Sequence, residues 1–128
     1  MKLLLDTHSL IWIAADDGQL SPRAAELFLD PDNEIHLSVA SLWEMSIKAS
    51  LGKLQLQRPL AEIVDEQLSR NAIRLLPIEP AHAYRVATLP WLHRDPIDRL
   101  LVAQCLCERI GLLGCDAAMD GYGIARYW

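Results

Sequence analysis

Cysteine is scarce in this chain, and apolar runs are short. The sequence has only three cysteines, an odd number, so a disulfide framework is not expected. Cys105 and Cys107 are two residues apart in a predicted helix and face different sides of it, which argues against a shared zinc ion. We expect these two thiols and Cys115 to be buried structural groups. No run approaches the roughly 20 apolar residues that span a bilayer, so no membrane helix is predicted.

The N-terminus lacks the uninterrupted apolar segment of a secretory leader. Lys2 followed by leucines has a slight likeness to one, but Asp6 and His8 interrupt the run. We therefore expect a cytoplasmic protein.

Several catalytic motifs are also missing. There is no glycine-rich phosphate loop and no Gly-x-Ser-x-Gly nucleophile elbow. Asp6 is followed two positions later by His8, so a phosphatase-like Asp-x-Asp-x-Thr is absent, and no two histidines form His-x-x-x-His. Nucleotide-binding proteins of the phosphate-loop kind, serine hydrolases and helical His–His zinc enzymes are thus poor matches. His8 itself is expected to be a polar residue at a helix start.

The chain has fewer positively than negatively charged residues. It contains twelve Lys and Arg and seventeen Asp and Glu, for a net charge of −5. Such a protein is a poor generic nucleic-acid binder, because phosphate contacts dominate that affinity. It can still bind nucleic acid if its acids gather at one site and a metal neutralises them. The hydrophobic content of 52% predicts a globular chain, and 128 residues fit one domain, residues 1–128.

Short apolar strands alternate with helices along the chain. The predicted strands are 3–5, 35–38, 73–76 and 112–115, and the predicted helices are 9–15, 22–29, 39–49, 60–70, 80–88 and 97–110. This alternation predicts an α/β fold with a parallel sheet and right-handed crossovers. The segment 97–110 is apolar nearly all round, so we expect it to be the most buried helix.

Four acids occupy comparable places in this pattern. Asp6 follows the first strand, Glu44 lies early in the helix after the second, Asp98 lies in the first turn of the buried helix, and Asp116 follows the last strand. Strand carboxyl ends and the following helix starts share one edge of a parallel sheet, so all four are expected to converge there. Gathered carboxylates repel one another, and a divalent cation such as Mg²⁺ or Mn²⁺ relieves that repulsion.

Each acid also has an ordinary structural explanation. Asp6 and Asp116 can cap the helices that follow them. Glu44 can form a capping box with Ser41. Asp98 can complement a helix dipole. Four such coincidences on one edge are less probable than a shared site, so we favour a metal site formed by the four acids.

The residues around these acids are similar to a known family. The stretches LLLDTHSLIW (3–12), LSVASLWEMSIKASLGKL (37–54), HRDPIDRLLVAQC (93–105) and LLGCDAAMDGYG (112–123) resemble a PIN-domain ribonuclease, specifically the VapC-type toxin of a bacterial toxin–antitoxin pair. The resemblance implies a PIN-like α/β sandwich whose central parallel sheet has about four to five strands flanked by helices.

The resemblance also assigns roles. It matches Asp6, Glu44, Asp98 and Asp116 to the catalytic, metal-binding acids, and it matches Thr7 and Ser38 to polar residues beside the site. It implies cleavage of RNA with Mg²⁺ or Mn²⁺, a cognate antitoxin and a homodimer. The family often has Thr or Ser shortly before the fourth acid.

Two neighbouring acids complicate the assignment. Gly114 and Cys115 stand where the family often has Thr or Ser, so Asp120 remains an alternative to Asp116 as the fourth acid. Asp95 is close to the third acid, but Pro96 after it indicates a helix N-cap.

The sequence leaves two hypotheses for function. The first is a metal-dependent endoribonuclease toxin. The second is a non-catalytic PIN-like module whose acidic pocket grips a basic partner. The presence of all four acids favours the enzyme.

Overall fold

A computed structural model describes all 128 residues and contains five strands, six α-helices and one 3₁₀ helix. The strands are β1 (Lys2–Leu5), β2 (Glu34–Ser38), β3 (Arg74–Leu76), β4 (Gly111–Leu113) and β5 (Arg126–Tyr127). The helices are α1 (Thr7–Ala14), α2 (Pro22–Leu29), α3 (Val39–Ser50), α4 (Leu60–Arg70), α5 (Pro80–Val86), α6 (Pro96–Glu108) and the 3₁₀ helix η1 (Ala117–Tyr122). No helix has the length and apolar character needed to cross a membrane.

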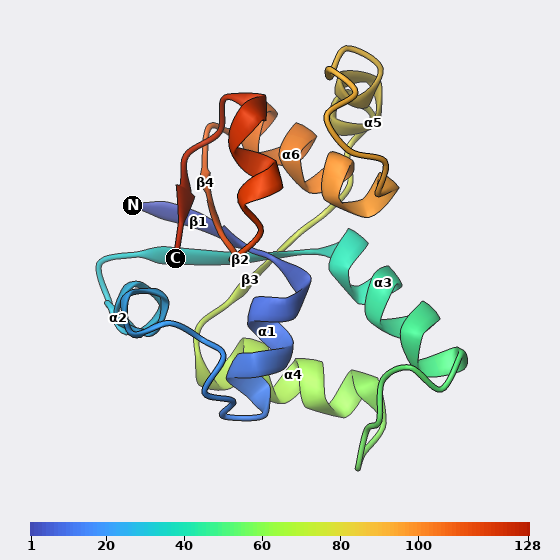
Figure 1. Cartoon of the computed structure of the whole chain (residues 1–128). Helices are drawn as coiled ribbons and strands as arrows, with labels where there is room; N and C mark the ends of the chain where they lie inside the picture. The colour runs from blue at the N-terminus through green and yellow to red at the C-terminus, as the bar shows by residue number, and fades with distance from the viewer.

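The strands form one parallel sheet with the order β3-β2-β1-β4-β5. The central position of β1 explains its uninterrupted leucines, because a strand with neighbours on both edges and layers on both faces meets no water. All strands end on the same side, so the segments that follow β1, β2 and β4 meet at one edge (Figure 1). The predicted α/β fold with a parallel sheet is confirmed.

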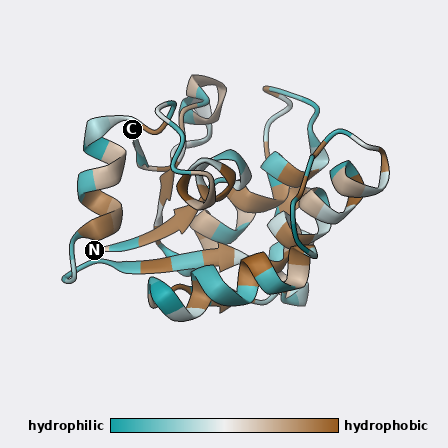
Figure 2. Cartoon of the chain, turned by 90° about the horizontal axis from the view of Figure 1, so that it is seen from below, coloured by the Kyte–Doolittle hydropathy of each residue, from teal (hydrophilic) through white to brown (hydrophobic).

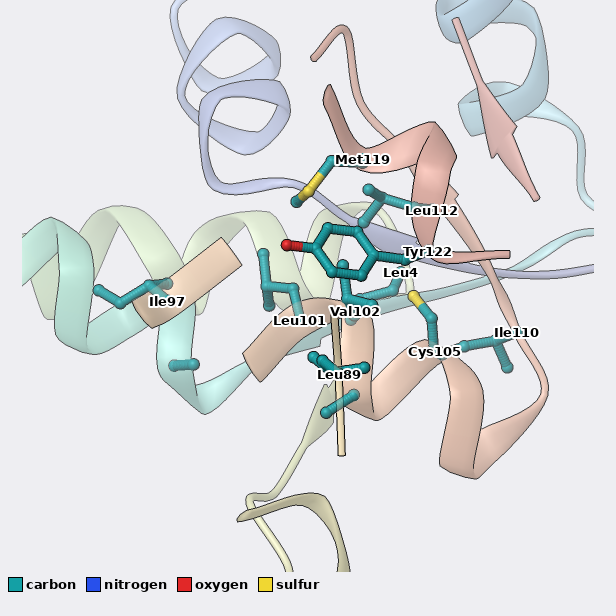
Figure 3. Packing of buried hydrophobic residues seen from close by; sticks show 12 residues of the cluster. Leu4, Leu89, Ile97, Leu101, Val102, Cys105, Ile110, Leu112, Met119 and Tyr122 are labelled. Atoms are coloured by element: carbon teal, nitrogen blue, oxygen red, sulfur yellow. The ribbon is translucent and has the colours of Figure 1, made fainter. Parts of the chain in front are cut away.

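Helices cover both faces of the sheet (Figure 1). On one face Leu4 and Leu112 pack against α6 and η1, and Figure 3 shows this cluster with Leu101, Val102 and Tyr122. On the other face, Leu3, Leu5 and Leu113 belong to a second cluster that includes residues of α1, α2 and α4. In Figure 2 the central strand β1 is largely brown after its first residue, whereas the helices carry both teal and brown residues, as expected for elements with one face in the core.

Helix α6 contributes more buried residues than any other helix, as predicted, and two of them are polar. Arg99 and Gln104 are buried along with five apolar or sulfur-containing residues. The helix ends earlier than predicted, at Glu108, because Arg109 adopts a left-handed conformation. Gly111 therefore does not end the helix; it opens β4, so this strand starts one residue earlier and ends two residues earlier than predicted.

Two elements and two cysteines differ from the predictions. Strand β5 and the 3₁₀ helix η1 were not among the predicted elements. Cys105 is buried as expected, but Cys107 and Cys115 are exposed. The prediction for these two thiols was wrong because Cys107 lies on the outer side of α6 and Cys115 lies in the loop beyond β4.

Candidate functional site

Asp6 lies at the end of the central strand and is held there by its backbone. Its N–H donates to the carbonyl of Leu113 at 2.9 Å, and the Ser9 hydroxyl donates to the same carbonyl at 3.0 Å. The β1–α1 turn is thereby fixed against the end of β4. Asp6 is buried, with an exposed fraction of 6%.

Gly114 makes room for Asp6. A Cβ atom at position 114 would lie 2.8 Å from the Cβ of Asp6 and 3.1 Å from its Oδ2. These distances are shorter than ordinary contacts, so any other residue at 114 would displace the aspartate. The loop after β4 is therefore matched to the side chain after β1.

A buried hydroxyl pair joins the helices that carry Asp6 and Glu44. The Thr7 hydroxyl at the start of α1 donates to the Ser41 hydroxyl of α3 at 2.9 Å. Ser38 caps α3 by accepting the N–H of Ala40 at 3.0 Å, so Ser38 and not Ser41 is the cap. The capping box considered for Glu44 and Ser41 is thus not formed. Of the two predicted supporting residues, Thr7 links the start of α1 to α3 through Ser41, and Ser38 caps α3 locally.

Glu44 is half-buried next to the end of the sheet. Its side chain has an exposed fraction of 12%, and its Oε2 lies 3.7 Å from Nζ of Lys48 one turn later. This is a favourable helix pair, but the distance is long for a hydrogen bond. The carboxylate is therefore not occupied by a close charge-assisted partner.

Helix α6 brings a third acid to the same edge. Asp95 caps the helix, accepting the N–H groups of Ile97 at 2.9 Å and Asp98 at 3.1 Å. The N-cap role predicted for Asp95 is confirmed. Asp98 lies in the first turn with a side-chain exposure of 21%.

The electrostatics of Asp98 indicate that the acids converge. The pKa of Asp98 is raised to about 7, chiefly by burial and then by the negative charges of Asp95, Asp6, Glu44 and Asp116, in that order. The pKa of Asp6 is also raised, chiefly by burial, although the nearby His8 charge opposes this and the Glu44 charge adds to it. The charges of Asp6, Glu44 and Asp116 therefore act on Asp98, and the charge of Glu44 acts on Asp6.

Asp116 and Asp120 differ in their partners. Asp116 is exposed and caps η1 by accepting the N–H of Ala118 at 2.9 Å. This is the helix-capping role that the sequence offered as an alternative to a metal ligand. Asp120 binds the Arg126 guanidinium at 2.6 and 3.0 Å, and this pair lowers its pKa. Arg126 also donates to the Gly114 carbonyl at 3.1 Å. Asp120 is thus neutralised, whereas Asp116 acts on Asp98.

The donor chemistry of this edge suits a hard divalent cation. Every acid offers only oxygen ligands, and the pKa values of Asp6 and Asp98 are raised chiefly by burial and further by neighbouring carboxylates. No three His, Cys, Asp or Glu side chains are arranged as they stand to hold one ion. Side-chain rotation is therefore needed for the acids to share a cation.

Two further residues at this edge were not predicted. Nε2 of His93 lies 3.5 Å from Oδ2 of Asp98, and Nδ1 of the same ring lies 2.6 Å from the Tyr122 hydroxyl. His93 stands in the same stretch of sequence as Asp95 and Asp98, so its position along the chain was a usable signal. Tyr122 is 29 residues away and only the fold brings it there.

Comparisons with solved structures show many similar folds. A chain of VapBC2 from Rickettsia felis bound to a promoter DNA fragment superposes with a TM-score of 0.76 at 16% identity, covering 99% of this chain and 98% of that one. VapBC-1 from nontypeable Haemophilus influenzae gives 0.71 at 15% identity, covering 99% and 97%. DNA-bound VapBC from Salmonella typhimurium gives 0.68 at 13% identity, with coverage of 99% and 97%. Identities this low show a shared fold.

Sequence comparison identifies the family. No curated protein sequence matches the chain at a significant level. The family model described as the PIN domain matches residues 3–124, a span that contains all four acids. The resemblance noted in the sequence is thereby confirmed, and the chain belongs to the PIN domain family.

Proposed function

We propose that this protein is a metal-dependent endoribonuclease and the toxin of a toxin–antitoxin pair. The observation that carries the proposal is the gathering of Asp6, Glu44, Asp98 and Asp116 at one sheet edge, where the charges of the other three raise the pKa of Asp98. Core packing gives no reason to collect carboxylates in this way. Similar folds among VapBC proteins support the toxin role.

In the proposed site the four carboxylates hold Mg²⁺ or Mn²⁺. When bound, such an ion stabilises the negative charge that develops on phosphoryl oxygens during hydrolysis. The backbone of Asp6 is hydrogen-bonded to Leu113, and its side chain lies against Gly114. Glu44 and Asp98 approach from separate helices, and Asp116 lies at the exposed rim.

The antitoxin is the partner that the site predicts. An acidic cluster with uncompensated charge attracts a basic side chain, and a guanidinium can occupy the place of the cation. An antitoxin that inserts an arginine here would block the site directly. Such inhibition would let cells carry a cytoplasmic ribonuclease. Strong expression of the wild-type chain without its gene neighbour should therefore stop growth, and normal growth with abundant folded protein would contradict the toxin role.

RNA cleavage tests the enzymatic proposal. The purified protein is incubated with total RNA in Mg²⁺, Mn²⁺ or excess chelator, and new RNA ends are mapped. We expect discrete new ends with metal, none with chelator, and none with Asp6→Asn or Glu44→Gln. Asp120→Asn is the matched control, because Asp120 is neutralised by Arg126, and it should cleave as the wild type does. Cleavage by the Asp6→Asn/Glu44→Gln double variant at the wild-type rate would refute the assignment. No cleavage by folded wild type with either metal would favour the non-catalytic module.

A further inference from the structure

The Tyr122 hydroxyl has a fully determined set of hydrogen bonds. It accepts from the backbone N–H of His93 at 3.3 Å and from Nη1 of Arg99 at 3.4 Å. A hydroxyl oxygen has two lone pairs and one proton, so these two donors occupy its acceptor capacity. The proton of Tyr122 is then directed to the remaining neighbour, Nδ1 of His93, at 2.6 Å.

This count assigns the tautomer of His93. Since Nδ1 accepts a hydrogen bond, the neutral ring carries its proton on Nε2. That atom is buried, and it has no hydrogen-bond partner. The nearest acidic oxygen is Oδ2 of Asp98 at 3.5 Å. A buried N–H without an acceptor is costly, and a small rotation of either side chain would give it one.

The loop that carries His93 is held rigidly. The guanidinium of Arg99 donates to the carbonyls of Pro90 at 2.8 Å, Val86 at 3.3 Å and Leu89 at 3.4 Å. It also stacks on the ring of Trp91, 4.0 Å from the ring centroid. Arg99 is buried, so these contacts are not transient surface pairs. The segment before α6 is thereby tied to α6 itself.

The 3₁₀ helix η1 braces the same loop from the other side. A Cβ atom on Gly121 would lie 2.7 Å from Cδ1 of Leu92, which shows how closely the two segments pack. Figure 3 shows the Tyr122 ring over the apolar cluster, near Leu4 and Leu112, with its hydroxyl projecting to one side. Tyr122 is therefore an immobile support for the His93 ring.

We propose that His93 is a positioning residue for the cation site, with Nε2–H donating to Oδ2 of Asp98. This contact fixes the rotation of the carboxylate and leaves its other oxygen free to face the remaining acids. The proposal rests on the proposed function, because it assumes that Asp98 is a metal ligand. Partners of this kind behind metal ligands change metal affinity by about 10–100-fold when they are removed.

A pair of amide substitutions isolates the contact. The nitrogen of a Gln side chain can replace Nε2, whereas the shorter Asn can replace only Nδ1. Mn²⁺ affinity is measured by calorimetry for wild type, His93→Gln and His93→Asn, alongside metal-free melting temperatures. We expect His93→Gln to stay within a few-fold of wild type and His93→Asn to bind about tenfold more weakly. Equal affinity for wild type and His93→Asn would overturn the proposal, and so would equal weakening in both variants, which indicates packing alone.

The imidazole NMR spectrum of the metal-free protein tests the geometry without any cation. We expect the Nε2–H tautomer in wild type at a pH where the ring is neutral, and a mixture of tautomers in Tyr122→Phe, which keeps the packing but loses the hydroxyl. An Nδ1–H tautomer in a protein that binds Mn²⁺ would overturn the role of His93 alone. A wild-type protein that binds no Mn²⁺ would instead overturn the proposed function.

Discussion

At the scale of single residues, the two acids at the start of α6, Asp95 and Asp98, have different roles. Asp95 satisfies two backbone N–H groups at the helix start, so its charge serves the fold. Asp98, three residues later, caps no backbone N–H group, and the charges of other acids raise its pKa. The Asp-Pro pair identifies the first role from sequence, because Pro favours the first helical position. The electrostatic cost at Asp98 becomes visible only when the other strands are in place.

The raised pKa of Asp98 predicts a pH-dependent stability in the absence of metal. The native state keeps this proton up to about pH 7, whereas the unfolded chain releases it near the ordinary value of 3.8. Between these values the native state binds more protons, so stability falls as pH rises. Asp98→Asn removes this decline. In chelator, thermal melts should show the variant more stable than wild type at pH 8 and similar to it at pH 4. A variant less stable than wild type at pH 8 would contradict the repulsion.

Gly114 predicts a steric test of Asp6. Gly114→Ala places a methyl group 2.8 Å from the Asp6 Cβ, so the carboxylate must move. A misplacement of about 1 Å in a reacting geometry costs roughly 100-fold in rate. We expect a loss of that order in metal-dependent cleavage. Gly18→Ala is the control, because nothing lies within 4 Å of a Cβ there. Unchanged cleavage by Gly114→Ala would show that Asp6 is not held against this loop.

At the scale of elements, the sequence predicts best what is local. The leucine run of β1, the Ser-Pro start of α2 and the Asp-Pro start of α6 are signals that lie within a few residues. Strand β5 has only two residues, too few to show a period, and it exists because it pairs with β4. The contact between His93 and Tyr122 likewise depends on the packing of η1 against the loop before α6. These features could not be predicted because they are tertiary.

The N-cap of α6 gives a prediction at this scale. Asp95→Ala leaves the N–H groups of Ile97 and Asp98 without their acceptor, so the free energy of unfolding should fall by about 0.5–2 kcal/mol. Asp95→Asn should cap nearly as well and should keep cleavage activity. Denaturant unfolding together with the cleavage assay measures both effects. Loss of activity in a stable Asp95→Asn variant would mean that Asp95, and not Asp98, is the third ligand.

At the scale of the whole molecule, α3 exposes an apolar stripe. The stripe consists of four exposed residues at four-residue spacing: Val39, Trp43, Ile47 and Leu51. The exposed fraction of Trp43 is 58%. Side chains with this spacing share one helix face. Exposed apolar area that is continuous in this way is typical of an interface.

We predict that the protein forms a homodimer through this stripe. Sedimentation velocity at micromolar concentration should show a dimer for wild type and a monomer for Trp43→Glu, because a charge in an apolar interface is costly to bury. Leu29→Glu on α2 is the control, since Leu29 is also exposed but lies outside the stripe. A wild-type monomer, or a dimer that Trp43→Glu leaves intact, would refute this interface.

The cation site is tested most directly by locating Mn²⁺ in crystals from its anomalous scattering. We predict a peak at the carboxyl edge of the sheet, about 2–2.5 Å from carboxylate oxygens of Asp6 and Asp98, with Glu44 and Asp116 near it. The peak should be absent in Asp6→Asn crystals grown in the same way. Mn²⁺ bound elsewhere, or no Mn²⁺ at this edge in crystals of protein that cleaves RNA, would contradict a shared site for the four acids.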